Sequence, residues 1–309
     1  MNGLGILCPG QGEQHPEMFA LFSEHQESQQ RLRDGAELLW GDAAAFDTHS
    51  RAGTAFDNTL AQPLICLRQL VTWLALAELL PRPRVFAGYS FGEFAAYGCA
   101  GTLTPEQTLR LSARRAALMD AATPAAAGML ALRGLNRGQV EEFCAAAGVE
   151  IAIVNGGDHF VVGGTAAGLD QVESLAVAAG AHRVQRLQVS VPSHTSALAA
   201  AGSAFRRELQ LAQLRPPQVP VIAGVNGAVV RECREVLDAL GDQIWQPIRW
   251  DLCQQAALEM GCRLFLELGP GNALSRMFRE AFPGIQVRAV DEFRSLQGVA
   301  DWVVKHCCA

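Results

Sequence analysis

One short stretch constrains the fold of this chain more than any other, because it stands where a strand pattern changes sharply into a helical pattern. The residues Gly-Tyr-Ser-Phe-Gly stand at positions 88–92, after the apolar run 85–87 and before a helical pattern that begins at Glu93. Glycines on both sides of such a turn let strand and helix pass without Cβ clashes, and the central serine projects above the sheet. The pattern predicts an α/β fold in which Ser90 is either a nucleophile or a packing residue of the turn.

Two further strand ends carry turns rich in glycine and proline, which indicates a mostly parallel sheet. The apolar run 4–8 leads into Pro-Gly-Gln-Gly at 9–12, and the run 264–268 leads into Gly-Pro-Gly at 269–271. In proteins that alternate strands and helices, the site lies at the carboxyl edge of the strands. We expect a hydrolase-like α/β core with a mostly parallel sheet, formed by residues 1–127 and 191–309. Its other expected elements include a strand at 219–225 and helices at 61–80, 105–122 and 248–260.

The segment between these two parts follows a different order. Strand and helix signals run β-α-β-β-α-β over about 60 residues, which is the order of a ferredoxin-like unit. We therefore predict a small inserted ferredoxin-like subdomain at residues 128–190. Its expected strands are 128–133, 150–154, 159–162 and 182–188, and its expected helices are 137–147 and 166–179.

Composition excludes several classes of protein. Half of the 309 residues are hydrophobic and only 18% are charged, so the chain can bury a sizeable core and is not a disordered segment. Acidic residues outnumber basic residues by 31 to 25, which argues against nucleic acid as a partner. The most apolar stretch, 70–80, is interrupted by polar residues and ends at Pro81, so we expect no membrane span.

The amino terminus and the cysteines bear on the cellular compartment. The first residues lack the basic segment of a secretory signal, and the nine cysteines include no C-x-x-C pair. Scattered cysteines of this kind usually pack as small hydrophobic residues in a reducing environment. We therefore expect a cytoplasmic protein with free thiols and no bound metal.

Three residues outside the serine turn are candidates for a site with Ser90. His194 follows an expected strand and precedes an alanine-rich helical pattern, so it is either a general base or a helix-start residue with a local backbone bond. Gln11 lies in the first turn and either donates to a developing oxyanion or satisfies its own loop. Arg115 lies beside apolar residues in a helical pattern, where it either binds a carboxylate or extends to the surface.

Taken together, five motifs resemble those of the malonyl-CoA:acyl-carrier-protein transacylase family. In chain order they are P-G-Q-G at 9–12, G-x-S-x-G-E at 88–93, Arg115, V-P-S-H at 191–194 and E-x-G-P-G at 267–271. The resemblance covers nearly the whole chain. Within the family, the chain looks closest to the transacylase (epsilon) subunit of malonate decarboxylase, on the stretches 88–90, 151–160 and 265–271.

The resemblance implies a role for each matching residue. Ser90 matches the nucleophile of the family, and His194 matches its base. Gln11 and the backbone N–H of Phe91 match the oxyanion hole, and Arg115 matches the arginine that binds the malonyl carboxylate. No carboxylate is required as a third member beside the serine and the histidine.

Three further positions match the family less directly. Asn155 falls near an asparagine of the small subdomain that contacts substrate in the family. Tyr89 stands where family members usually carry histidine, and Arg249 stands where they usually carry glutamine. The family position matched to Arg249 orients the catalytic histidine through its backbone carbonyl, so we expect Arg249 to do so here and to line the substrate site.

The expected activity is transfer of a malonyl group from malonyl-CoA to the phosphopantetheine-type thiol of an acyl carrier protein, with no bound cofactor. The resemblance favours a role as the transacylase subunit of malonate decarboxylase, whose other subunits would then be further partners. A malonyltransferase of fatty-acid or polyketide synthesis is the alternative within the family. Two alternatives lie outside it: a serine esterase or thioesterase of the α/β-hydrolase class, which shares the G-x-S-x-G turn, and a non-catalytic subunit that docks carrier protein.

Overall fold

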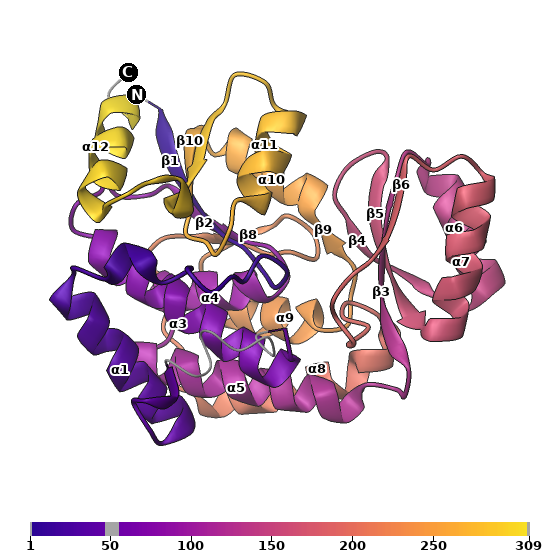
Figure 1. The fold of residues 1–309 in the computed structure, drawn as a ribbon, viewed down its shortest axis with the longest axis horizontal. Helices are drawn as coiled ribbons and strands as arrows, with labels where there is room; N and C mark the ends of the chain where they lie inside the picture. The colour runs from indigo at the N-terminus through magenta and orange to yellow at the C-terminus, as the bar shows by residue number, and fades with distance from the viewer. Residues whose placement is uncertain (1, 47–55, 308–309) are drawn as a thin grey trace.

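Two separate sheets organise the computed structural model, which describes residues 2–46 and 56–307 (Figure 1). The larger sheet has six strands in the order β11-β10-β1-β2-β7-β8. Every neighbouring pair in it is parallel except β7 with β8, so the predicted α/β fold with a mostly parallel sheet is confirmed. The strands are β1 (Gly3–Cys8), β2 (Val85–Gly88), β7 (Val221–Ile222), β8 (Val229–Val230), β10 (Cys262–Glu267) and β11 (Gln286–Ala289).

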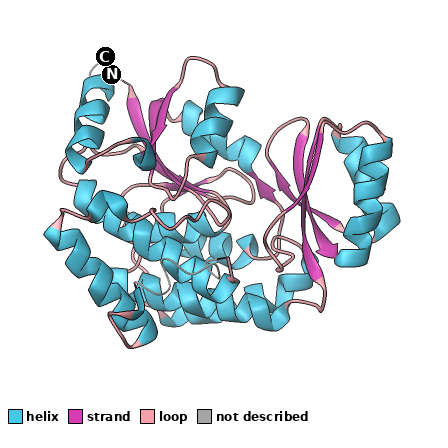
Figure 2. Cartoon of the chain, in the orientation of Figure 1, coloured by secondary structure: helices cyan, strands magenta, loops and turns pink. Residues whose placement is uncertain are grey.

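Helices cover both faces of the larger sheet, because its strands are apolar on both sides. In β1, Ile6 and Cys8 join one hydrophobic cluster and the intervening Leu7 joins another. The first cluster includes residues of α1, α3, α4, α5, α8, α9 and α12, and the second includes residues of α10 and α11. Helices lie on both sides of the larger sheet (Figure 2). The helices of this part are α1 (Gln26–Trp40), α3 (Asn58–Leu76), α4 (Phe91–Cys99), α5 (Pro105–Ala122), α8 (Ala199–Leu211), α9 (Cys233–Gln243), α10 (Trp250–Glu259), α11 (Ala273–Ala281) and α12 (Leu296–Cys307).

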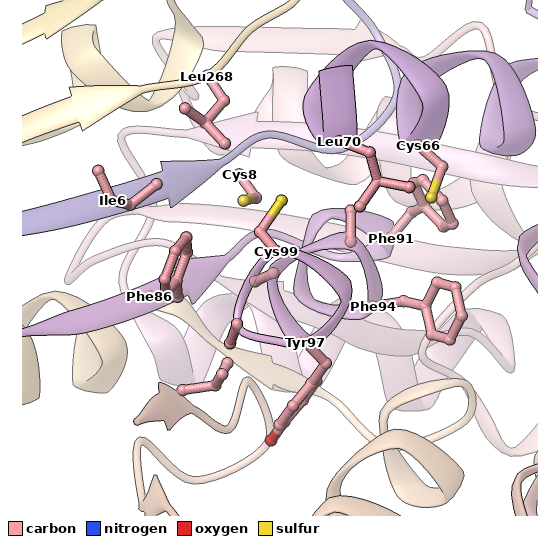
Figure 3. Close-up of a cluster of buried hydrophobic side chains, with 14 of the residues drawn as sticks. Ile6, Cys8, Cys66, Leu70, Phe86, Phe91, Phe94, Tyr97, Cys99 and Leu268 are labelled. Atoms are coloured by element: carbon pink, nitrogen blue, oxygen red, sulfur yellow. The ribbon is translucent and has the colours of Figure 1, made fainter. Parts of the chain in front are cut away.

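The helix α3 forms the centre of the larger cluster. Its Cys66 and Leu70 pack toward Phe91 and Phe94 of α4, the helix that follows the serine turn (Figure 3). Among the described residues it is also the one helix long and apolar enough to cross a bilayer. The fold buries 78% of its most apolar stretch, as expected for the core helix of a folded domain. The buried side chains of α3 therefore pack against α4, the helix that begins directly after Ser90.

The smaller sheet has five strands in the order β6-β3-β5-β4-β9. The first four pair antiparallel, and α6 and α7 lie together beside the sheet (Figure 1). Their sequence order is the β-α-β-β-α-β order of a ferredoxin-like unit. The elements are β3 (Ala127–Arg133), α6 (Arg137–Ala147), β4 (Glu150–Val154), β5 (His159–Thr165), α7 (Ala166–Ala178), β6 (Arg183–Arg186) and β9 (Ile248–Arg249).

The fifth strand, β9, corrects one sequence expectation. Residues 248–260 were expected to form a single helix, but Ile248 and Arg249 pair parallel with Ile153 and Val154 of β4, and the helix α10 starts at Trp250. Ile248 is apolar and completely buried, so it fits a sheet position as well as a helix position. The chain outside 128–190 therefore contributes a strand to the smaller sheet, which links the two sheets near the carboxyl end of β4.

Candidate active site

The serine turn holds Ser90 in a strained backbone conformation between β2 and α4. Its φ of 54° lies in the region that L-residues rarely occupy, and its ψ is −123°. The neighbouring glycines are required by space. A Cβ on Gly88 would lie 2.1 Å from the backbone nitrogen of Glu93, and one on Gly92 would lie 1.9 Å from the carbonyl oxygen of Cys8. The glycines therefore let the turn close tightly enough to present the serine at the end of β2.

The side chain of Ser90 meets that of His194, although 104 positions separate them in the chain. The Oγ of Ser90 lies 2.8 Å from Nε2 of His194. The other ring nitrogen, Nδ1, lies 2.6 Å from the backbone carbonyl oxygen of Gln243, and an acceptor there requires Nδ1 to carry the proton. Nε2 is then the free acceptor, correctly placed to take a proton from the serine hydroxyl.

Burial controls the protonation of His194, which is completely inaccessible to solvent. The pKa of its imidazole is lowered to about 3, mainly by desolvation and to a smaller extent by the charge of Arg115. The bond to the carbonyl of Gln243 raises this pKa and only partly offsets the burial. His194 is therefore neutral near pH 7, in the form that a general base requires.

Arg115, in α5, is the buried cation of the site. Only 1% of its surface is exposed, which excludes the surface alternative. Its Nη1 donates to Oε1 of Gln62 at 2.8 Å and its Nη2 to Oε1 of Gln243 at 2.7 Å, whereas its Nε has no partner. Both partners are neutral amides, so the guanidinium can still accept an anionic ligand. Burial lowers the pKa of this guanidinium, and the nearby charge of Glu93 opposes that effect.

Gln11 lies in the first turn, which approaches the serine turn closely. A Cβ on Gly10 would lie 2.7 Å from the carbonyl oxygen of Tyr89 and 3.4 Å from Cβ of Ser90. The Nε2 of Gln11 is buried and has no hydrogen-bond partner. Phe91 opens α4, and the N–H groups of a first helical turn lack acceptors within the helix. The candidate N–H donors of the site are therefore the side-chain amide of Gln11, in a turn that approaches the serine turn, and the backbone N–H of Phe91, next to Ser90.

Asn155 and Tyr89 connect the smaller sheet to the serine turn. Asn155 follows β4, is nearly buried, and its Oδ1 has no hydrogen-bond partner. Burial raises the pKa of the Tyr89 hydroxyl to about 12, and a hydrogen bond with the Asn155 side chain partly opposes this rise in pKa. The ring of Tyr89 packs edge-to-face on Trp250, with 5.4 Å between ring centroids. Asn155 thus reaches the residue next to the candidate nucleophile.

The role expected for the backbone of Arg249 is wrong. The carbonyl that accepts from His194 belongs to Gln243, at the end of α9. The side chain of Arg249 forms a two-bond ion pair with Asp251, with distances of 2.9 and 2.7 Å. Its backbone N–H donates to the carbonyl oxygen of Gly224 at 2.8 Å. Arg249 stays close to β4, but its guanidinium is already paired with a carboxylate.

Three buried polar residues of the site were missed by sequence reasoning: Gln62, Gln243 and Glu93. One oxygen of Glu93 accepts from the backbone N–H of Gly224 at 3.0 Å, and the other has no partner. Burial raises the pKa of Glu93 to about 8, while the bond from Gly224 and the charge of Arg115 act in the opposite direction. The glutamate directly after the G-x-S-x-G turn was the available signal, because the first turn of α4 points back into the site.

Metal-binding side chains do not gather anywhere in residues 2–46 and 56–307. No group of three or more His, Cys, Asp or Glu in this part of the chain is arranged to hold an ion. The eight cysteines in the same part are free, and six of them are buried. The side chains gathered around Ser90 are a histidine, amides and a buried guanidinium.

Proteins similar to this chain in sequence and fold include malonyl-CoA:acyl carrier protein transacylases. Residues 59–294 match the family described as the acyl transferase domain. The malonyl CoA-acyl carrier protein transacylase of Haemophilus influenzae is 27% identical over 98% of this chain and 100% of that protein. The crystal structure of malonyl-CoA:acyl carrier protein transacylase from Xanthomonas oryzae has a TM-score of 0.90 and 29% identity, covering 98% of each chain.

A second similar structure is a complex. It contains a malonyl-transacylase with a type II PKS acyl-carrier protein, and it matches with a TM-score of 0.91 and 26% identity over 97% of this chain and 99% of that one. The family match alone covers most of the chain and includes the serine turn, Arg115 and His194. The chain belongs to the acyl transferase domain family and is an acyltransferase.

Proposed function

We propose that this protein is a malonyl-CoA:acyl-carrier-protein malonyltransferase that carries the malonyl group as an ester on Ser90. The observation that carries the proposal is the 2.8 Å contact of Ser90 with a neutral His194, next to a buried Arg115 whose hydrogen-bond partners are amides. A buried guanidinium without a carboxylate partner favours an acyl group that ends in a carboxylate. The names of the similar transacylases support the same substrate.

Acylation begins when the malonyl carboxylate pairs with Arg115. The Oγ of Ser90 attacks the thioester carbonyl carbon while Nε2 of His194 takes its proton. The side-chain amide of Gln11 and the N–H of Phe91 donate to the oxyanion, each contributing about 3 kcal/mol of transition-state stabilisation. The C–S bond then breaks, and the proton on His194 passes to the CoA sulfur, so that CoA leaves as a thiol.

Transfer to the carrier repeats these steps in reverse order. The carrier thiol gives its proton to His194 and attacks the carbonyl carbon of the malonyl ester, and the C–O bond to Ser90 breaks as the serine oxygen recovers the proton. Water must be kept away from the ester, since hydrolysis would convert the transferase into a thioesterase. The kinetics should be ping-pong. The carbonyl of Gln243 holds the imidazole, so no carboxylate is needed for that task.

Intact mass spectrometry tests the proposal directly. Mixing the protein with malonyl-CoA should add about 86 Da, the mass of one malonyl group, and a carrier-protein thiol should remove it. Acetyl-CoA is the matched substrate without a carboxylate, and it should label the protein much more slowly. A protein that hydrolyses p-nitrophenyl esters but transfers nothing to thiols would be an esterase instead. A protein that forms no adduct would favour the docking subunit.

The carrier protein and the pathway form a finer proposal. We propose an acyl carrier protein as the partner and malonate decarboxylase as the assembly, on the stretches 88–90, 151–160 and 265–271. Its other subunits are then further partners, and the free cysteines are consistent with a cytoplasmic location. Comparing kcat/KM for the carrier of a malonate decarboxylase with that for a fatty-acid or polyketide carrier separates the pathways. A preference for either of the last two would replace this finer proposal.

The pH dependence of malonyl loading is the second test. We expect the loading rate to stay constant between pH 7 and pH 5, because burial holds the pKa of His194 at about 3 and the imidazole remains neutral. A histidine with an ordinary pKa of about 6.5 would lose roughly 25-fold of its neutral form over this interval. Rapid quenching followed by mass spectrometry measures the rate, and enzyme returned from pH 5 to pH 7 controls for unfolding. A fall in rate centred near pH 6.5 would contradict the expectation.

A further inference from the structure

The side chain of Gln243 touches two parts of the site that have different tasks. This residue ends α9 and is completely buried. Its Oε1 accepts from Nη2 of Arg115 at 2.7 Å, and its Nε2 donates to the backbone carbonyl oxygen of Ser90. Its own backbone carbonyl accepts from Nδ1 of His194, as described above. One residue therefore contacts the base, the backbone of the nucleophile and the buried cation.

The two side-chain contacts require opposite chemistry at the two ends of one group. Arg115 presents only donors and needs an acceptor, whereas the carbonyl of Ser90 is an acceptor and needs a donor. A primary amide supplies both in one neutral, planar group. An ionised carboxylate would supply only acceptors, and an aliphatic chain would supply neither. Glutamine is the neutral side chain of this length that satisfies both contacts at once.

The geometry points to Gln243 as a positioning residue whose amide ties the guanidinium of Arg115 to the backbone of Ser90, and this inference rests on the proposed function. Ser90 sits in a strained conformation, so its carbonyl direction and its Oγ direction are fixed together by the turn. The amide then sets the distance between the site of the acyl carboxylate and the attacking oxygen. An error of about 1 Å in such an alignment costs about 100-fold in rate.

Gln62 offers a matched comparison within the same site. It accepts from Nη1 of Arg115 at 2.8 Å, and it is as buried as Gln243. Its Nε2 donates to Oδ1 of Asn58 at 2.6 Å, away from the serine turn. Gln62 therefore holds the arginine alone, whereas Gln243 holds both the arginine and the nucleophile. Substituting each residue in turn therefore distinguishes the loss of a contact to Arg115 from the loss of the contact to Ser90.

The experiment compares Gln62→Leu with Gln243→Leu, using the rates of loading from malonyl-CoA and acetyl-CoA. Leucine keeps the backbone carbonyl of residue 243, so the contact to His194 survives. We expect Gln62→Leu to reduce kcat/KM for malonyl-CoA about 10-fold and to reduce acetyl loading by a smaller factor than Gln243→Leu does. We expect Gln243→Leu to reduce malonyl loading about 100-fold and acetyl loading about 10-fold, with a lower kcat for both.

The acetyl result decides the inference, because acetyl has no carboxylate for Arg115 to bind. If Gln243→Leu reduces acetyl loading no more than Gln62→Leu does, Gln243 only holds the arginine and the proposed link to Ser90 is refuted. Unchanged loading of both substrates also refutes it. Gln243→Glu has the same size and serves if the leucine variant fails to fold: its carboxylate cannot donate to Ser90, so acetyl loading should fall there too. Wild-type protein that forms no malonyl adduct would instead refute the proposed function.

Discussion

Replacement of Ser90 by alanine should abolish formation of the malonyl adduct and reduce carrier malonylation by roughly 10⁴-fold or more. The substitution removes one oxygen atom, and that oxygen is the only group that contacts Nε2 of His194 at 2.8 Å among the described residues. No ester can then form. The carrier thiol could receive the malonyl group only by attacking malonyl-CoA directly, without the acyl-enzyme intermediate. Intact mass and transfer of radiolabelled malonyl measure the two losses separately.

The same variant controls for the fold of the turn. Alanine retains the Cβ of serine, so the strained conformation with φ of 54° is equally costly before and after the change. Its thermal unfolding should match that of the wild type. His194→Ala should lower the rate of loading by a similar order, because the base and the nucleophile act as one unit. Transfer by Ser90→Ala at the wild-type rate would show that the ester does not lie on the pathway.

The parts of the fold that the sequence predicts correctly carry local signals. The helix predicted at 105–122 has these bounds in the structure, with Thr104 and Gln107 bonded reciprocally at its start and Pro105 in its first turn. The serine turn is likewise determined by the space around Gly88 and Gly92. The order of strands and helices in 128–190 could be predicted because each element has its own hydrophobic pattern and is bounded by turn residues.

The parts that could not be predicted depend on contacts between distant segments. Residues 219–225 read as one strand, but only Val221 and Ile222 pair with β2, because the chain then turns back to form β8. The carbonyl that orients His194 comes from position 243, and no local pattern marks a backbone atom 49 residues away. Arg249 was assigned that task from a family position, although its guanidinium pairs with Asp251.

Charge balance within the site was equally hidden from the sequence. Arg115 and Glu93 are both buried and influence each other electrostatically, while His194 is neutral near pH 7. A buried charge is tolerated only where partners compensate for the lost hydration. Burial raises the pKa of Glu93 to about 8, so this carboxyl group is mostly protonated near pH 7 and does not neutralise Arg115. The hydrogen-bond partners of the guanidinium are the amides of Gln62 and Gln243. The proposed malonyl carboxylate would supply the anionic partner that these amides do not.

Replacement of Arg115 by alanine should remove the preference for malonyl over acetyl groups. In the proposed mechanism the guanidinium pairs with the malonyl carboxylate, and acetyl-CoA leaves that guanidinium without an anionic ligand. The loss of a buried charge-assisted pair corresponds to a few kcal/mol, so the ratio of malonyl to acetyl kcat/KM should fall by about 10²–10³-fold. Acetyl transfer should persist, since Ser90 and His194 keep their contact.

A neighbouring arginine of the same helix supplies the control. Arg114 is largely exposed and pairs with Glu208 at 2.8 Å on the surface, so Arg114→Ala should leave both loading rates within about two-fold of the wild type. Competition between malonyl-CoA and acetyl-CoA, measured as the ratio of the two adduct masses, compares the variants in one experiment. Arg115→Ala leaves Gln62, Gln243 and Glu93 buried without their cation, so its folding must be verified by thermal unfolding. Discrimination that survives in a folded Arg115→Ala protein would show that another group recognises the carboxylate.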